Sequence, residues 1–313
     1  MDDVTDTVFR RVVSDSAAPD VNMTEFVNVD GLCSPGWPKL MPRLSTKQDN
    51  IPVIAQIWGK KPENFEQIAK EIASGEIPGF VGIDLNFGCP DKAVLKNECC
   101  SALAQPDLRD KALAIIKATQ KGAGSASRRI PVSIKTRLGF DKIDYSWHEF
   151  LLQQKPSMLS VHVRTTRQMS KVPAQWDAIE PIVKLRDEIS PETKIVLNGD
   201  IMNRAQGIEL AKKHKVDGIM IGRGVFQDPY CFAVTSPWPE ASKQDKINLL
   251  RKHFELFAST YSADERKYAP LKKFVKIYIS NFDGAAELRE QIMQTESVEQ
   301  GLELLDSLVG DGK

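Results

Sequence analysis

A thiol and an amide that could take part in acid–base chemistry lie close together in one short stretch of this 313-residue chain. Asn86 and Cys89 follow an alternation of apolar residues over 81–85, and the stretch ends in Gly88-Cys89-Pro90. The alternation predicts a short buried strand, and α/β proteins build their sites where such strands end. A lone cysteine is either a small buried hydrophobe or a reactive thiol, so the neighbouring strands must decide between the two.

The other predicted strands also end in polar residues, cations or glycines. Together the strand ends supply Gln56, Asn86, Cys89, Lys135, Arg137, His162, Arg164, Asn198, Gly199, Asp200, Gly222 and Arg223. Each residue alone is weak evidence for a functional site, because a histidine or lysine on a strand is more often structural than catalytic. The last two strand ends are more specific, since glycine amides beside a guanidinium occur where parallel barrels bind phosphate. We therefore expect a phosphorylated cofactor there, with Lys135 and His162 facing its other end.

The elements that must position these residues alternate between strand and helix. The predicted strands are 21–27, 51–57, 80–87, 130–139, 158–164, 194–197 and 218–221. The predicted helices are 4–13, 62–74, 108–121, 147–154, 176–189 and 203–214, with Asp2 and Asp3 placed to cap the first of them. This alternation predicts an α/β fold, a TIM (β/α)8-type barrel over residues 1–235 whose first strand is missing. The unpaired edges would be the strands at 21–27 and 218–221.

Beyond residue 235 the pattern predicts an all-helical domain over 236–313, with helices at 243–261, 268–280 and 298–308. Residues 243–280 hold nine Lys or Arg against four Asp or Glu. An apolar stripe on the helix 268–280 leaves Lys272, Lys273 and Lys276 on the opposite side. Such a face is by default a solvated one, and the alternative is a surface that contacts nucleic acid.

Composition excludes several other classes of protein. Lys plus Arg and Asp plus Glu number 42 each, so net charge alone indicates neither nucleic acid nor membrane. The five cysteines are odd in number and lack Cys-x-x-Cys spacing, which argues against a disulfide framework and a structural zinc site. We therefore expect no bound metal and no membrane-spanning segment. The acidic first residues do not resemble a signal peptide, so we expect the reducing cytoplasm as the compartment.

Several motifs in series resemble the tRNA-dihydrouridine synthases, in the order and at the spacing of that family. They are Met1-Asp-Asp-Val-Thr-Asp, Asp84-Leu-Asn-Phe-Gly-Cys-Pro, Ser133-Ile-Lys-Thr-Arg-Leu-Gly, Val161-His-Val-Arg-Thr, Asn198-Gly-Asp and Ile221-Gly-Arg-Gly. The resemblance implies a flavin-dependent barrel with a helical RNA-binding domain, which uses NADPH to reduce specific uridines of tRNA to dihydrouridine. We expect such a protein to be a monomer.

The resemblance also assigns roles by position. It implies an FMN site made of Met1, Gln56, Lys135, His162, Asn198, Gly199, Asp200, Gly222 and Arg223. It implies a substrate site made of Asn86, which would hold the uracil, together with Arg137, Arg164, Lys272, Lys273 and Lys276.

Cys89 matches the proton donor of the family: hydride passes from the reduced flavin to C6 of uracil while the thiol protonates C5. A cationic Lys135 could stabilise the reduced ring, and the base must leave its stack to reach a barrel mouth. Two alternatives stay open, another flavin barrel that acts on a small pyrimidine or enone, and an RNA-binding protein on a decayed barrel.

The chain also departs from the family pattern. Residues 94–102 replace a glycine-rich turn and carry two further thiols, Cys99 and Cys100, while Val163 and Thr166 stand where glycine and arginine are usual. Because non-glycine residues are strained at positive φ, we expect the 94–102 loop to follow a different path. The family also has an apolar strand ending in Ala-Pro just before the position of Met1, so we expect a truncated or mis-assigned start.

Overall fold

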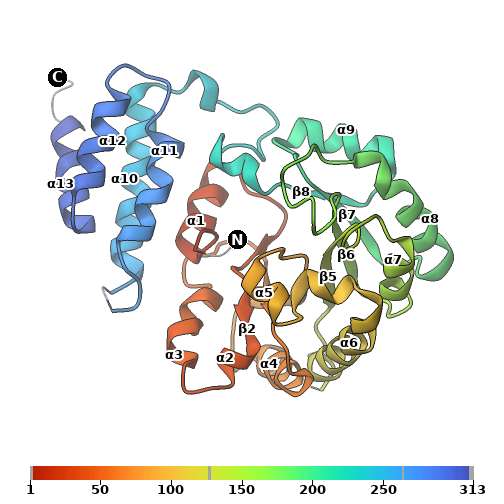
Figure 1. The fold of residues 1–313 in the computed structure, drawn as a ribbon. Coiled ribbons are helices and arrows are strands. Elements are labelled where there is room, and N and C mark those ends of the chain that lie inside the picture. The colour runs from red at the N-terminus through yellow and green to blue at the C-terminus, as the bar shows by residue number, and fades with distance from the viewer. Residues whose placement is uncertain (1–2, 126–127, 263, 310–313) are drawn as a thin grey trace.

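The computed structural model describes residues 3–125, 128–262 and 264–309. Its strands are all parallel and curl into one sheet, with β1, β3, β4, β5, β6, β7 and β8 in sequence order and β2 beside β3 (Figure 1). They are β1 (Asn22–Met23), β2 (Val27–Asn28), β3 (Val53–Trp58), β4 (Phe80–Phe87), β5 (Val132–Arg137), β6 (Met158–His162), β7 (Lys194–Asn198) and β8 (Gly218–Met220). The predicted α/β barrel class is confirmed. Within the described residues no pairing joins β8 to β1, so the expected edges are open.

Helices cover the outer face of the sheet (Figure 1). They are α4 (Pro62–Ser74), α6 (Arg109–Ala123), α7 (Tyr145–Leu152), α8 (Glu180–Ile189) after the 3-10 turn η4 (Trp176–Ile179), and α9 (Arg204–His214). Proline at its first turn starts α4, and Gly75 with φ of 88° ends it, as helix-capping rules predict. The helices α4 and α6 approach closely because Gly122 lacks a side chain, since a Cβ there would lie 2.2 Å from the carbonyl oxygen of Glu66.

The first predicted strand, 21–27, is wrong as one element because the structure divides it into β1 and β2. At the break, the backbone amide of Gln56 donates to the Thr24 side-chain hydroxyl at 3.0 Å instead of to a backbone carbonyl. Side-chain bonds of this kind compete with strand pairing. The segment between the two strands therefore follows its own path along the edge of β3.

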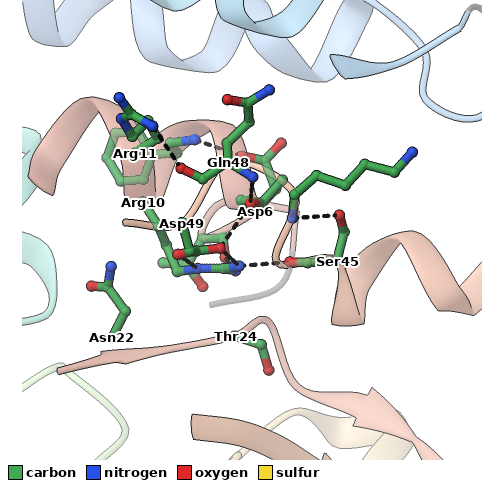
Figure 2. A network of polar contacts seen from close by, with 12 residues as sticks. Asp6, Arg10, Arg11, Asn22, Thr24, Ser45, Gln48 and Asp49 are labelled. Carbon is green, nitrogen blue, oxygen red and sulfur yellow. Dashed lines mark hydrogen bonds and ion pairs between the residues drawn. The ribbon is translucent and has the colours of Figure 1, made fainter. Parts of the chain in front are cut away.

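The opening helix α1 (Thr7–Ser16) begins later than predicted and is capped by Asp6, whose carboxylate accepts from the Phe9 amide at 2.8 Å. The prediction that Asp3 caps this helix is therefore wrong, and Asp2 lies outside the described residues. Figure 2 shows how α1 is held: Arg10 donates two hydrogen bonds to Asp49, at 2.5 and 2.8 Å, and a third to the Ser45 carbonyl at 2.7 Å. Both charged side chains are almost fully buried.

The C-terminal part is helical, as predicted. Its elements are α10 (Lys243–Thr260), the 3-10 helix η7 (Ala269–Phe274), α11 (Val275–Tyr278), α12 (Ala285–Gln294) and α13 (Val298–Val309). The single helix predicted over 268–280 is wrong, because the segment is mostly a 3-10 helix and closes with one α turn. The helix α12 was not predicted from the sequence. Of these helices, α10 packs on α1, with α12 and α13 farther from the sheet (Figure 1). Phe9 of α1 also meets Phe274 of η7, with ring centroids 4.7 Å apart.

Shorter elements complete the described chain. They are α2 (Val29–Leu32), α3 (Trp37–Leu40), η1 (Met41–Leu44), α5 (Lys92–Lys96), η2 (Cys100–Ala104), η3 (Pro106–Leu108), η5 (Arg223–Phe226) and η6 (Trp238–Glu240). None of the described helices has the length and apolar character needed to cross a membrane.

The buried pair on α1 leads to a stability prediction. Arg10→Met leaves the Asp49 carboxylate buried without its main partner, so we expect the free energy of unfolding to fall by about 3 kcal/mol. Arg11→Met is the matched control on the same helix, because Arg11 bonds Asp15 near the surface, and such pairs contribute less than about 1 kcal/mol. Urea unfolding of the two variants measures both values, and equal losses would contradict the prediction.

Candidate active site at the carboxyl ends of the strands

The carboxyl ends of the strands surround a cavity of about 890 Å³. Its walls contain most of the residues that the strand ends were expected to bring together: Gln56, Asn86, Cys89, Lys135, Arg137, His162, Asn198, Gly199, Asp200, Gly222 and Arg223. The cavity also extends along the open edges of β1 and β8. Arg164 is buried behind the wall, and Lys272, Lys273 and Lys276 lie in the helical part away from it. Met1 lies outside the described residues.

A buried carboxylate, Asp84 of β4, connects three adjacent strands, β3, β4 and β5, beneath the cavity. The Gln56 side chain of β3 donates to it at 2.8 Å, and the Ser133 hydroxyl of β5 donates to it at 2.6 Å. Burial raises the pKa of Asp84 to about 6, although both hydrogen bonds and the nearby Lys135 oppose the rise. Asp84 was not among the predicted site residues, although a charged residue inside an apolar alternation is the signal that could have indicated a role.

The turn after β4 holds Cys89 in place through Asn86. The Asn86 side-chain oxygen accepts from the backbone amides of Gly88 and Cys89 at 3.0 and 3.1 Å, and its nitrogen donates to Gln56 at 3.4 Å. The thiol of Cys89 is part of the cavity wall and only partly exposed. Burial raises the pKa of this thiol, against the lowering effect of Arg137 and Lys135. At neutral pH the sulfur therefore carries its proton.

The rival thiols, Cys99 and Cys100, are buried in a small cluster with Val94, and neither is among the residues that surround the cavity. Glu98 and Cys100 adopt φ of 55° and 51°. The expectation that this loop avoids positive φ is therefore wrong for these two positions. The hydroxyl of Ser101 donates to the carbonyl of Cys89 at 2.7 Å and so ties the loop to the turn after β4.

The adjacent strands β5 and β6 contribute cations and a neutral histidine to the cavity wall. Burial lowers the pKa of Lys135 to about 8, with Arg137 acting in the same direction and Asp84 against it. Burial and the nearby cations, Lys135 foremost, lower the pKa of His162 to about 2. The His162 Nδ1 atom is buried without a hydrogen-bond partner among the described residues. A neutral imidazole with an unused ring nitrogen on a cavity wall fits a polar ligand there.

The loops after β7 and β8 form the end where phosphate binding was expected. Asp200 forms ion pairs with Arg164 and, at 2.8 Å, with Arg223. Asp200 therefore orients two guanidinium groups, and Arg164 acts from behind the wall instead of inside the cavity. Gly222 faces open space, because a Cβ built there meets no atom within 4 Å. That space leaves room for a ligand to approach the backbone.

A second cluster of titratable groups lies outside the cavity, on the outer helices. His214, at the end of α9, contacts Glu180 at 3.0 Å and Asp177 at 3.7 Å. The Lys213 ammonium pairs with the same Asp177 oxygen at 3.0 Å. A cation of the protein itself, Lys213, therefore lies against the acidic side chains of this cluster.

A parallel α/β barrel with a thiol, a lysine and a neutral histidine around its mouth defines an enzyme of the barrel class. The family model described as "Dihydrouridine synthase (Dus)" matches residues 1–310 of the chain. This chain belongs to the dihydrouridine synthase family, which is a family of oxidoreductases.

Named relatives match over most of their length. A "Probable tRNA-dihydrouridine synthase" of Staphylococcus aureus (strain N315) is 45% identical over 311 residues, which cover 98% of this chain and 90% of the relative. The protein with the same description from Staphylococcus epidermidis (strain ATCC 12228) is 44% identical over 310 residues, or 98% and 91% of the two chains. A "Probable tRNA-dihydrouridine synthase 2" of Bacillus subtilis (strain 168) is 43% identical over 311 residues, or 98% and 91%.

The buried carboxylate predicts a pH effect on stability. The folded-state pKa of Asp84 lies near 6 against an ordinary value of 3.8, so the native chain keeps a proton that the unfolded chain has released. Stability therefore falls as pH rises from 4 to 6, by up to about 3 kcal/mol, and the penalty is complete above pH 6.

Asp84→Asn should flatten this fall, which is measured by urea unfolding of cofactor-free protein between pH 4 and 7. A smaller slope should remain, because burial also raises the pKa of Asp6 to about 6. An unchanged slope would mean that Asp84 titrates normally.

Proposed function

We propose that this chain is a tRNA-dihydrouridine synthase that holds FMN in its barrel mouth and reduces uridines of tRNA with NADPH as the reductant. One observation carries the proposal: a protonated Cys89 thiol, Lys135 and a neutral His162 line the same cavity. The named relatives and their near-complete coverage support the substrate. We also infer a cytoplasmic monomer.

The residues present fit a flavin mononucleotide. His162 Nδ1 is available as a hydrogen-bond partner for the ring system or its side chain, and Gly222 with Arg223 leaves space and positive charge for a phosphate. Lys135, with Gln56 beneath it, would face the pyrimidine part of the flavin and favour its reduced, anionic form. When bound, FMN would supply the hydride that reaches C6 of uracil.

The protein itself would supply the proton. Cys89 would donate from Sγ to C5 of the uracil, and its raised pKa keeps the sulfur protonated for that step. A substitution of Asn86 would disturb this arrangement, because its side-chain oxygen accepts a hydrogen bond from the backbone amide of Cys89. Its contacts favour a role in aiming the thiol as well as in holding the base.

The tRNA would deliver a base that has left its stack, since Cys89 lies in the wall of a cavity that a base within a helix cannot enter. Exposed lysines of the helical part, Lys273 and Lys276, would contact the phosphates. Lys272 is used differently: its ammonium donates to the carbonyls of Met293, at 2.9 Å, and Thr295. We therefore drop Lys272 from the proposed RNA surface and regard it as a cap on the end of α12.

The proton donor is tested with Cys89→Ala. This variant should keep its flavin and its NADPH oxidation but lose uridine reduction by at least ~100-fold, because it removes a general acid and no cofactor contact. Flavin absorbance, NADPH consumption and dihydrouridine formation are measured on the same preparation. Cys99→Ala and Cys231→Ala are matched controls with buried thiols, and full activity in Cys89→Ala would disprove the assignment.

The RNA surface is tested through salt dependence. Neutralising Lys273 and Lys276 together should weaken tRNA binding and lower the slope of log K against log salt by about one unit for each lost phosphate contact. Lys272→Gln should leave the slope unchanged while lowering stability, because it removes hydrogen bonds within the protein. An equal loss of slope in Lys272→Gln would contradict this division of roles.

A further inference from the structure

Glu25 is a carboxylate that lies completely buried in the segment between β1 and β2. Its neighbours Met23, Thr24 and Phe26 are part of the cavity wall. A buried carboxylate is stable only when a cation or strong donors compensate the loss of water. The partner of Glu25 therefore bears on the shape of the candidate active site.

That partner comes from the helical part, 241 positions away in the sequence. Arg266 donates to both carboxylate oxygens of Glu25, at 3.0 and 3.3 Å, which is the two-pronged geometry of strong arginine–carboxylate pairs. Burial alone would lower the pKa of Arg266, but these hydrogen bonds raise it. Asp6, the cap of α1 shown in Figure 2, lies 3.4 Å from the same guanidinium.

A second cation, which comes from the barrel, also approaches Glu25. The Nη1 atom of Arg43 lies 3.7 Å from the carboxylate, beyond hydrogen-bond distance. Arg266 thus makes the two close contacts, and among the described residues the ion pair that would remain without it is the longer one with Arg43.

A continuous chain of hydrogen bonds leads from Glu25 to the catalytic turn. The Thr24 hydroxyl donates to the Glu25 carbonyl at 2.7 Å and accepts from the Gln56 amide at 3.0 Å. The Gln56 side chain accepts from Asn86 at 3.4 Å. Asn86 in turn accepts from the amide of Cys89 at 3.1 Å. A displacement of residues 24–26 would therefore reach the turn that carries the thiol.

We propose that Arg266 is a positioning residue for the reaction: its pair with Glu25 docks the helical part on the barrel and holds the segment 23–26, and thereby the turn of Cys89. The catalytic readout rests on the proposed function, whereas the docking itself does not. In this arrangement the proposed RNA-binding part of the chain supports the segment 23–26 of the cavity wall from behind as well as contacting the substrate.

Three variants test the coupling: Arg266→Met, Glu25→Gln and the two combined. Arg266→Met should lower kcat for dihydrouridine formation about 10- to 100-fold, because small misplacements of catalytic groups have effects of that size, while KM for tRNA changes less than about twofold. Adding Glu25→Gln should recover part of the lost kcat, because the side chain at position 25 is then no longer a buried charge without its close partner, although Asp6 still loses its ion pair with Arg266.

The matched control is Arg251→Met, which removes the same side chain from the same helical part. Arg251 pairs only within that part in the described contacts, with Asp306 and Glu255. The control should retain wild-type kcat. If Arg266→Met does not fold, Arg266→Lys keeps the charge without the two-pronged geometry and should show a smaller loss in the same direction.

A second readout does not depend on activity. The alkylation rate of Cys89 by iodoacetamide, followed by peptide mass spectrometry on folded protein, should change severalfold in Arg266→Met and return toward wild type in the double variant. Equal rates in all variants, a kcat loss that the double variant does not recover, or a rise in tRNA KM with unchanged kcat would overturn the proposal. A wild-type protein that forms no dihydrouridine would contradict the proposed function but leave the alkylation result intact.

Discussion

The carboxylate of Asp84, buried at the centre of the sheet, is the constraint on which the site depends. A buried carboxylate must find donors, and its two donors come from the strands on either side, Gln56 from β3 and Ser133 from β5. A shift of one residue in either strand would turn these donors to the opposite face of the sheet and leave the carboxylate unpaired. Two residues further along the same strand face, Asn86 is directed toward the turn of Cys89. The register of three strands and the aim of the thiol therefore follow from the same buried group.

Burial also sets the protonation of the groups around the mouth, and it acts in opposite directions on acids and bases. It raises the pKa of Cys89 and lowers that of His162, so both are neutral at physiological pH. Lys135 undergoes the same lowering but retains most of its charge, because Asp84 opposes the shift and leaves its pKa near 8. One cavity thus combines a protonated thiol, a neutral imidazole and a cation.

The residues around the barrel mouth were predictable because parallel strands bring their carboxyl ends to one edge of the sheet. Predicting the strands therefore also predicts that the residues at their carboxyl ends lie close together. The predicted elements were wrong where a side chain distant in the sequence forms a contact that changes the local structure. The strand at 21–27 breaks because Thr24 bonds Gln56 and Glu25 bonds Arg266, and no periodicity records either partner. The helix at 268–280 forms mainly as a 3-10 helix, and α12, which packs nearby, was not recognised. Local pattern predicts which elements exist more reliably than where tertiary contacts interrupt them.

The same limit applies to charge. Nine cations over residues 243–280 predicted a surface for RNA, yet several of them have partners inside the protein. Arg266 pairs with Glu25, Lys272 caps α12, and Lys252 joins α10 to α1 through Asp15 at 2.7 Å. Cations that form ion pairs across the boundary attach the helical part to the barrel and are no longer available to release counterions from RNA. A basic segment can therefore serve for docking within the protein as much as for binding RNA. The lysines of 243–280 that remain exposed are Lys243, Lys267, Lys273 and Lys276, and the last two of these form the proposed RNA surface.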